Sequence, residues 1–149
     1  MAERINTGRN FCFAALVGGR LAAYCWCALE SIEPEHTAGA GVALSYPKHL
    51  AYLYHGFTHP SFRGKRLRKG ILQLAFQHLA DHGVRELFAL VNFTNFSAIR
   101  GSRRLGYVPL GHMVVSRLGR SRVLFFPRRA KQLGIRFGKE VVARQSQAS

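Results

Sequence analysis

Basic residues crowd the segment from Thr58 to Gly70, which joins a predicted strand to a predicted helix. Backbone N–H groups in the first turn of a helix have no acceptor within the helix, and the helix dipole adds positive potential there. The segment therefore predicts a site for an anion such as phosphate. Five cationic side chains add to the field: Arg63, Lys65, Arg66, Arg68 and Lys69. A solvated basic loop without a ligand explains the same residues equally well.

Histidine is the second residue type here that could do chemistry. His55 and His59 lie near the end of the strand that precedes the basic segment. An imidazole titrates near neutral pH, so either residue could relay a proton. A packed or solvated side chain is the alternative for a single histidine on a strand.

The three cysteines, Cys12, Cys25 and Cys27, lie among aromatic residues. An odd number in this setting favours reduced, buried thiols over a disulfide framework. A hairpin that turns at Gly18-Gly19 would place Cys12 opposite Cys25, so a bridge between these two strands is the alternative. No spacing of cysteine or histidine in the sequence predicts a metal site.

The hydrophobic pattern predicts the elements that must position these residues. Two apolar runs, 11–17 and 21–29, flank a glycine pair and predict a β-hairpin. Residues 51–58 alternate as a strand that ends before Pro60, with Tyr52, Tyr54 and Gly56 on one face and Leu53, His55 and Phe57 on the other. Apolar residues recur at helical spacing over 68–82, and 87–91 is an unbroken apolar run. The order strand, helix, strand predicts a parallel pair.

The remaining segments complete one domain. Asn95 is placed to cap a helix that runs through Leu105, and residues 107–116 and 121–126 predict a second hairpin. Residues 31–48 contain glycines and prolines and predict a loop.

The domain boundaries follow from the polar ends of the chain. We expect a flexible N-terminus over residues 1–10, one folded domain over 11–138 and a polar tail over 139–149.

The charge balance restricts the choice of partners. The 149 residues include 22 Lys and Arg against 7 Asp and Glu, a formal net charge of +15, while 48% hydrophobic residues exclude a disordered polycation. No carboxylate lies between Glu86 and Glu140, so this region should carry a strong positive field. The partners that it favours are a phosphate-bearing cofactor, a nucleic acid, an acidic lipid head group or an anionic acceptor.

The longest apolar stretch, 11–29, does not predict a membrane span because Gly18, Gly19 and Arg20 interrupt it. An arginine at the centre of a span costs about 2.5–3.5 kcal/mol. Glu3 lies where a signal peptide carries positive charge. We expect a cytoplasmic protein without a membrane span.

Two segments resemble the GNAT (Gcn5-related) N-acetyltransferase family. The first segment runs from Arg63 to Arg68. The family pattern there reads Arg or Gln, two variable residues, Gly, one variable residue, then Gly or Ala. In this sequence Arg66 and Arg68 occupy the two glycine positions. The second, Asn95 to Tyr107, preserves the Asn, the Ala and the Leu-Gly-aromatic ending of the family's other signature. The resemblance covers roughly residues 11–126.

The resemblance implies an α+β fold, a mixed α/β arrangement with a twisted, mostly antiparallel sheet, a splayed parallel central pair and helices on both faces, short at the N-terminus. It implies acetyl-CoA or another acyl-CoA as co-substrate and no metal. Pantetheine would lie in the splay, with backbone hydrogen bonds from Phe57 and Thr58 and with Asn95 beside it. The pyrophosphate would bind backbone N–H groups of these residues: Arg63, Gly64, Lys65, Arg66, Leu67, Arg68 and Lys69.

The implied reaction is direct attack of an amine on the acyl-CoA thioester, with a base, oxyanion donors and an acid. Ser102 stands where the family usually has its acid, a tyrosine, and a serine hydroxyl is a poor proton donor for a thiolate. The leaving group would then depart unprotonated or through water, and Ser102 would serve in helix packing. The family's usual glutamate base is missing from residues 51–58, which leaves His55 and His59 as candidates.

Two departures from the family keep alternatives open. Only ten residues precede the first hairpin, where the family has a strand and two helices that help to form the acceptor groove. The domain is then trimmed, completed by a second subunit in a homodimer, or a remnant that binds without turnover. The arginines at the glycine positions could clamp phosphates or keep the pyrophosphate away. The competing function is a basic GNAT-like module that binds nucleic acid or another polyanion.

Overall fold

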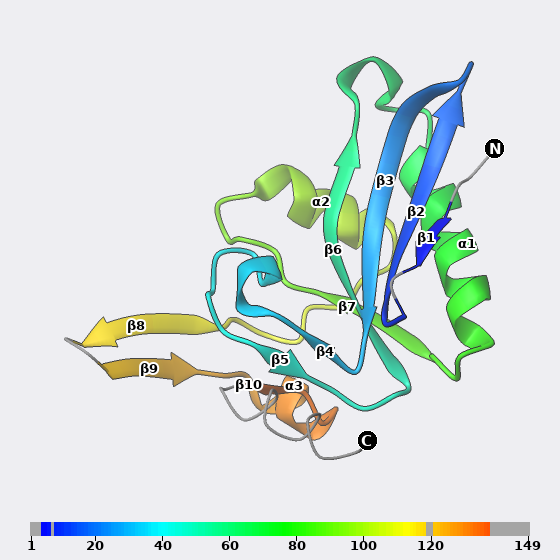
Figure 1. Cartoon of the computed structure of the whole chain (residues 1–149). Helices are drawn as coiled ribbons and strands as arrows, with labels where there is room; N and C mark the ends of the chain where they lie inside the picture. The colour runs from blue at the N-terminus through cyan, green and yellow to red at the C-terminus, as the bar shows by residue number, and fades with distance from the viewer. Residues whose placement is uncertain (1–3, 7, 119–120, 138–149) are drawn as a thin grey trace. The chain divides into compact units, whose positions relative to one another are not determined.

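The computed structural model describes residues 4–6, 8–118 and 121–137 (Figure 1). The chain forms two compact units, of which the first contains residues 1–32 and 48–90 and the second contains residues 33–47 and 91–149. The predicted polar tail, 139–149, lies outside the described residues. The domain boundaries at residues 10 and 138 stay a prediction.

The first unit is built on a five-stranded sheet in the order β1-β2-β3-β6-β7. Its strands are β1 (Arg4–Asn6), β2 (Asn10–Val17), β3 (Arg20–Leu29), β6 (Leu50–Thr58) and β7 (Glu86–Ala89). Neighbouring strands are antiparallel except β6 and β7, which are parallel. The predicted α+β class and parallel pair are confirmed. The pair lies at one end of the sheet rather than at its centre, because β8 and β9 form a sheet of their own.

Strand β1 lies within the segment that was predicted to be a flexible terminus. Arg4 pairs with Phe13 and Asn6 with Phe11, so β1 extends the sheet beyond β2. Three residues are too few to show an alternating pattern, and β1 is defined by its pairing with the edge of β2. The sequence therefore gave no signal for it.

The hairpin of β2 and β3 forms as predicted, but its register differs by one residue. Ala15 pairs with Ala23 and Leu16 with Leu21, so Ala22 is an extra residue on β3. Such a bulge shifts all later pairs by one position, and Cys12 consequently lies opposite Trp26 and not opposite Cys25. All three cysteines are free and buried, which agrees with the prediction of reduced, buried thiols.

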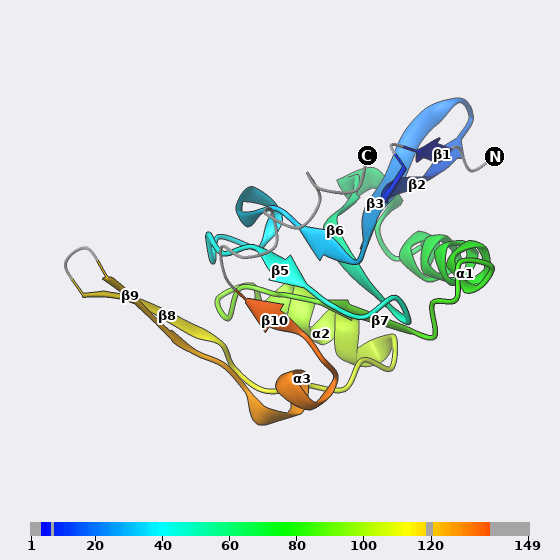
Figure 2. The same ribbon diagram turned by 60° about the horizontal axis from the view of Figure 1, so that its bottom comes forward.

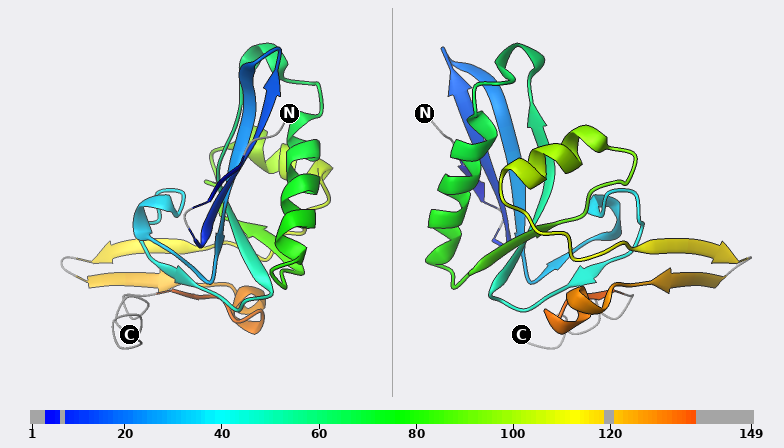
Figure 3. Two further views of the ribbon diagram at one scale, coloured as in Figure 1. Left: turned by 45° about the vertical axis from the view of Figure 1, so that its right-hand side comes forward. Right: turned by 180° about the vertical axis from the view of Figure 1, so that it is seen from behind.

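Helix α1 (Leu67–Ala80) packs on one face of this sheet along β2 and β3 (Figure 3). Its buried residues are Ile71, Ala75 and Leu79, spaced at helical intervals. On the facing strand, the Phe11 ring lies 5.5 Å from the His78 ring and 5.3 Å from the ring of His82, between ring centroids. This contact joins the helix to the sheet.

Short elements connect the larger ones. They are β4 (Ser31–Ile32), the 3-10 turn η1 (Pro34–His36), β5 (Leu44–Ser45) and the 3-10 turn η2 (Pro60–Phe62). The segment predicted to be a loop, 31–48, therefore contains two short strands and one turn. Each of these strands is only two residues long, too short for a sequence pattern to show.

The second unit contains α2 (Phe96–Arg104), β8 (Val114–Leu118), β9 (Ser121–Phe125), α3 (Arg128–Gln132) and β10 (Arg136–Phe137). The predicted hairpin is present as β8 and β9, which run side by side in Figure 2. Its first strand begins at Val114 and not at Tyr107. Pro109 has no N–H to donate, and Gly111 has a φ of 131° with Pro127 packed against it, so the chain between them is not extended sheet.

No helix in the described part of the chain is long and apolar enough to cross a membrane.

Replacing Phe11 by alanine tests the contact between helix and sheet. Phe11 is 1% exposed, so Phe11→Ala should lower the free energy of unfolding by about 3–5 kcal/mol. Urea denaturation followed by circular dichroism measures the change. Phe76→Ala, at a residue of α1 that is 40% exposed, is the control and should cost less than half as much. Equal losses for the two variants would contradict the assignment of Phe11 to the core.

Candidate functional site

Strands β6 and β7 stop pairing halfway along β6. They pair from Leu50 opposite Glu86 to Leu53 opposite Ala89, where β7 ends. Strand β6 continues to Thr58 with β3 as its partner on the other side. In the described first unit, residues 54–58 thus have no strand paired along the edge that β7 occupied. The open end that the resemblance implied is present.

A bulge in β6 accompanies this separation. Tyr24 pairs with Phe57 and Trp26 with Tyr54, so His55 and Gly56 together face the single residue Cys25. The extra residue breaks the predicted alternation, because Phe57 joins Tyr54 on one face of the sheet rather than lying on the opposite face. His55 takes the left-handed conformation at the bulge, with a φ of 45°.

The bulge leaves the His55 side chain exposed. Its ring packs edge-on against Tyr54, 5.2 Å between centroids. His59 is held differently, since its Nδ1 accepts a hydrogen bond from the Ser61 N–H at 3.3 Å. Of the two histidines considered for proton transfer, His59 therefore has one ring nitrogen committed to the backbone.

The turn between β6 and α1 presents a run of backbone donors. The Arg63 N–H donates to the Pro60 carbonyl at 3.1 Å, and the Lys69 N–H donates to the Arg66 carbonyl at 3.0 Å. Between them, the N–H groups of residues 64–68 have no acceptor among the described residues. Five successive donors at the start of a 14-residue helix suit an anion.

Two left-handed residues shape this turn. Gly64 has a φ of 77°, and Arg66, the N-cap of α1, has φ and ψ of 57° and 18°. The conformation is open to glycine at no steric cost but costs other residues about 1–2 kcal/mol. Arg66 therefore adopts a conformation that favours glycine, the residue that the family pattern has at this position. Left-handed residues in a turn can direct successive N–H groups toward one anion.

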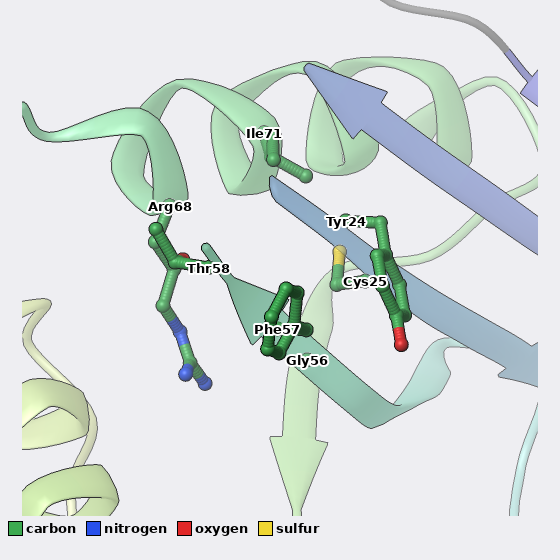
Figure 4. A pocket seen from close by; sticks show the side chains of 7 residues that line it. All are labelled: Tyr24, Cys25, Gly56, Phe57, Thr58, Arg68 and Ile71. Carbon is green, nitrogen blue, oxygen red and sulfur yellow. The ribbon is translucent and has the colours of Figure 1, made fainter. Parts of the chain in front are cut away.

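The two arginines at the glycine positions differ in where their side chains lie. Arg66 is exposed, whereas Arg68 is half-buried and lines a pocket (Figure 4). A Cβ placed on Gly56 would lie 3.7 Å from the Arg68 guanidinium carbon. No ion pair with Arg68 is found in the described residues. The pocket is lined by Tyr24, Cys25, Gly56, Phe57, Thr58, Arg68 and Ile71.

Cys25 lines this pocket, and its thiol interacts with that of Cys27. A side-chain hydrogen bond from Cys27 lowers the pKa of the Cys25 thiol, burial opposes this shift, and the charge of Arg68 lowers the pKa further. The same hydrogen bond and burial raise the pKa of Cys27. Cys25 is therefore the first thiol of this pair to ionise, beside a guanidinium.

Three of the predicted site residues, Phe57, Thr58 and Arg68, meet in the pocket. Arg63 lies nearby in contact with the same strand, because its Nε donates to the Thr58 carbonyl at 3.4 Å. The Lys65 ammonium lies 5.2 Å from the Phe62 ring centroid, a cation–π contact. Leu67 begins α1 and is half-buried.

The pocket also contains residues that sequence reasoning missed: Tyr24, Cys25, Gly56 and Ile71. A signal was available for one of them, since a glycine inside a strand often marks a bulge or a close approach. Cys25 and Tyr24 carry no such signal. They reach the pocket through the register of β3 against the bulge.

Asn95 and Ser102 belong to the second unit. Asn95 caps α2 as predicted, with its Oδ1 accepting from the Ala98 N–H at 3.1 Å and from the Ser97 hydroxyl at 3.0 Å. Ser102 is half-buried, and its carbonyl accepts from the N–H groups of Leu105 and Tyr107. Contacts of these two residues with pantetheine or thiolate stay predictions.

A metal centre has no ligand set within the described residues, since no three histidine, cysteine or acidic side chains gather there. The donors that the structure offers are backbone N–H groups and guanidinium, which suit phosphate.

Comparison with known proteins agrees with this geometry. The family model described as the acetyltransferase (GNAT) family matches residues 1–107. No curated protein sequence matches the chain significantly.

Among solved structures, the chain is similar to AAC(6')-Iy in complex with the bisubstrate analogue CoA-S-monomethyl-acetylneamine, with a TM-score of 0.59, 18% identity and coverage of 76% of this chain and 71% of that one. It is also similar to the ribosomal-protein-alanine N-acetyltransferase of Brucella melitensis biovar Abortus 2308, with a TM-score of 0.54, 15% identity and coverage of 75% and 73%. At these identities the likeness shows the fold.

Substituting glycine at the two arginine positions should change stability in opposite directions. Arg66→Gly removes the steric cost of a left-handed residue and should raise the free energy of unfolding by about 1 kcal/mol. Arg68→Gly places glycine in the first turn of a helix and should lower it by about 0.5–1 kcal/mol. Urea denaturation measures both. A loss of stability in Arg66→Gly would contradict the left-handed N-cap.

Proposed function

The chain belongs to the acetyltransferase (GNAT) family, whose members are CoA-dependent N-acetyltransferases, and from that premise we propose that it transfers an acetyl or short acyl group from acyl-CoA to an amine acceptor by direct attack. The observation that carries the proposal is the run of five N–H groups, residues 64–68, without acceptors in the described residues. These donors are suited to the pyrophosphate of CoA. They follow, after the short turn η2, a strand whose parallel partner ends at Ala89.

The remaining contacts to the co-substrate are proposed from the same segment. Pantetheine would lie along the part of β6 beyond Leu53, where Phe57 and Thr58 offer backbone groups. Arg63, Lys65, Arg66 and Lys69 are exposed cations around the five donors and would attract the phosphates.

Arg68 has a separate part in this proposal. Its guanidinium is the charged group of the pocket and has no carboxylate partner among the described residues. A half-buried cation without a counterion favours an incoming anion. We propose that Arg68 binds a phosphate oxygen, as a clamp rather than as an obstacle.

For the proton transfers we propose His55 as the base that removes the proton of the ammonium group. It lies at the bulge, is exposed, and belongs to the part of β6 that β7 no longer covers. The thiolate would leave into water, since Ser102, the residue at the family's acid position, is a poor donor. The identity of the acceptor amine stays open, with an anionic amine favoured by the net charge of +15.

One observation favours a second function, binding of CoA or another polyanion without turnover. The Arg68 side chain occupies space beside Gly56 that pantetheine would use. If this side chain stays in place, phosphates bind at the turn while the thioester remains outside the pocket. Binding and turnover therefore have to be measured separately.

Binding is tested by calorimetric titration with acetyl-CoA. Gly64→Pro removes one N–H and forbids the φ of 77°, so the affinity should fall at least about tenfold. Gly70→Ala is the matched control, because Gly70 lies in α1 outside the donor run with open space around it, and its affinity should stay unchanged. Unchanged affinity in Gly64→Pro, with an unchanged melting temperature, would remove the cofactor assignment.

Turnover is tested by thiol release from acetyl-CoA with a panel of primary amines. His55→Gln should lower kcat by about 100-fold at neutral pH, while the KM for acetyl-CoA stays unchanged. The loss in kcat should become smaller as the pH rises toward the pKa of the free amine, which is about 10 for a lysine-like acceptor. Near that pH the amine is already deprotonated in solution and needs no base from the protein.

His59→Gln serves as the control for this experiment and should retain kcat, since its Nδ1 is held by the Ser61 N–H. A His55→Gln enzyme with full kcat at neutral pH rejects His55 as the base. Binding without turnover for any amine supports the second function.

A further inference from the structure

Helix α2 carries aromatic side chains that the fold does not cover. Phe93 is 75% exposed and Phe96 is 66% exposed, one just before the helix and the other at its first residue. Two phenylalanines three residues apart that stay exposed contribute little to folding and are available to a ligand. The buried phenylalanines of the described residues, Phe11, Phe13 and Phe88, are at most 8% exposed.

Arginines share the face of α2 that carries Phe96. Residues 96, 100 and 103 are spaced four and three apart, which places them along one side of the helix. Arg100, Arg103 and the adjacent Arg104 are all exposed. The three arginines form no ion pair with a described carboxylate. The sequence has no Asp or Glu between Glu86 and Glu140 that could neutralise them.

We propose that this aromatic-basic face, made of Phe93, Phe96, Arg100, Arg103 and Arg104, binds single-stranded nucleic acid. Phosphates are attracted by a cluster of cations, and unpaired bases stack on exposed aromatic rings and on guanidinium planes. Phe96, Arg100 and Arg103 lie along one side of α2, and Phe93 lies in the segment just before it. The proposal rests on the second unit alone and does not depend on the acyltransfer proposed above.

An anionic lipid surface is the main competitor, and the arrangement of the side chains disfavours it. Helices that lie in a membrane interface separate their apolar face from their basic face. In α2 the phenylalanine and the arginines share a face, and the helix has only nine residues. Phenylalanine and arginine side chains on the same face suit the alternating phosphates and bases of a nucleic acid better than they suit the flat boundary between lipid and water.

The test uses the full chain and fluorescence anisotropy with a labelled oligouridine of about 20 nucleotides, longer than a single binding site. Binding should weaken with salt, and oligothymidine should bind similarly if stacking and phosphate contacts dominate. Phe96→Ala should lower the affinity at least about fivefold and leave the salt slope unchanged. Arg100→Gln should reduce the slope of log affinity against log salt by about 0.7.

Two matched controls separate this face from charge and exposure in general. Phe125→Ala removes a phenylalanine that is 76% exposed on β9, and Arg85→Gln removes an exposed charge in the first unit. Both should leave affinity and salt slope near the wild-type values. Equal effects of Phe125→Ala and Phe96→Ala, or of Arg85→Gln and Arg100→Gln, would overturn the proposal.

Three further outcomes also decide against it. Equal affinity for a duplex, whose bases are already stacked, rules out base stacking on Phe96. Binding to vesicles of phosphatidylserine and phosphatidylcholine without binding to oligonucleotide assigns the face to lipid. Displacement of the oligonucleotide by saturating CoA assigns it to the co-substrate, whereas simultaneous binding supports a separate site.

Discussion

The chain between β6 and α1 has to turn from strand to helix while leaving a series of its own N–H groups without acceptors. Any α-helix has unsatisfied donors in its first turn. Here the left-handed Gly64 and Arg66 extend the series backward, so that five successive residues, 64–68, present donors. The conformation of Arg66 costs folding energy that a ligand can offset. Strain and unsatisfied donors at one turn are the physical basis of the candidate site.

The sheet supports this turn with a second irregularity. The bulge at His55 and Gly56 redirects the last residues of β6, and the parallel partner β7 ends at the same level of the strand. The Arg68 guanidinium lies beside Gly56, at a distance where a Cβ would make ordinary van der Waals contact with it. Strand β6 therefore has an open edge and an exposed histidine, and the Arg68 guanidinium of α1 lies beside the same part of the strand. These features follow from the bulge and from the end of β7, two local events in an otherwise regular sheet.

Sequence patterns predicted the long elements because each has a period that burial imposes. The helical spacing of Leu72, Ala75, Phe76 and Leu79 predicted α1. The glycine pair between two apolar runs predicted the β2–β3 hairpin. The patterns could not locate the bulges at Ala22 and at His55-Gly56, because one extra residue leaves composition and hydrophobicity unchanged while shifting every later pair. The opposition of Cys12 to Cys25 and the face of Phe57 were wrong for this reason.

The site was predictable in outline and not in detail. The basic turn after Pro60 and the cap at Asn95 were readable from residue types, whereas the difference between Arg66 and Arg68 was not. The structure shows that Arg66 adopts a left-handed conformation and is exposed, whereas Arg68 lines the pocket. Short strands such as β1 could not be predicted from the sequence either, because they are defined by their pairing with a neighbouring strand and not by a pattern of their own.

The central claim is that the N–H groups of residues 64–68 hold the pyrophosphate of CoA. Amide chemical shifts of ¹⁵N-labelled protein, titrated with CoA and separately with pantetheine, test it most directly, because pantetheine lacks the pyrophosphate. We predict that CoA moves the amide signals of residues 64–68 strongly and that pantetheine leaves them in place while moving signals of Phe57 or Thr58. If CoA binds and the signals of residues 64–68 do not move, the claim is contradicted.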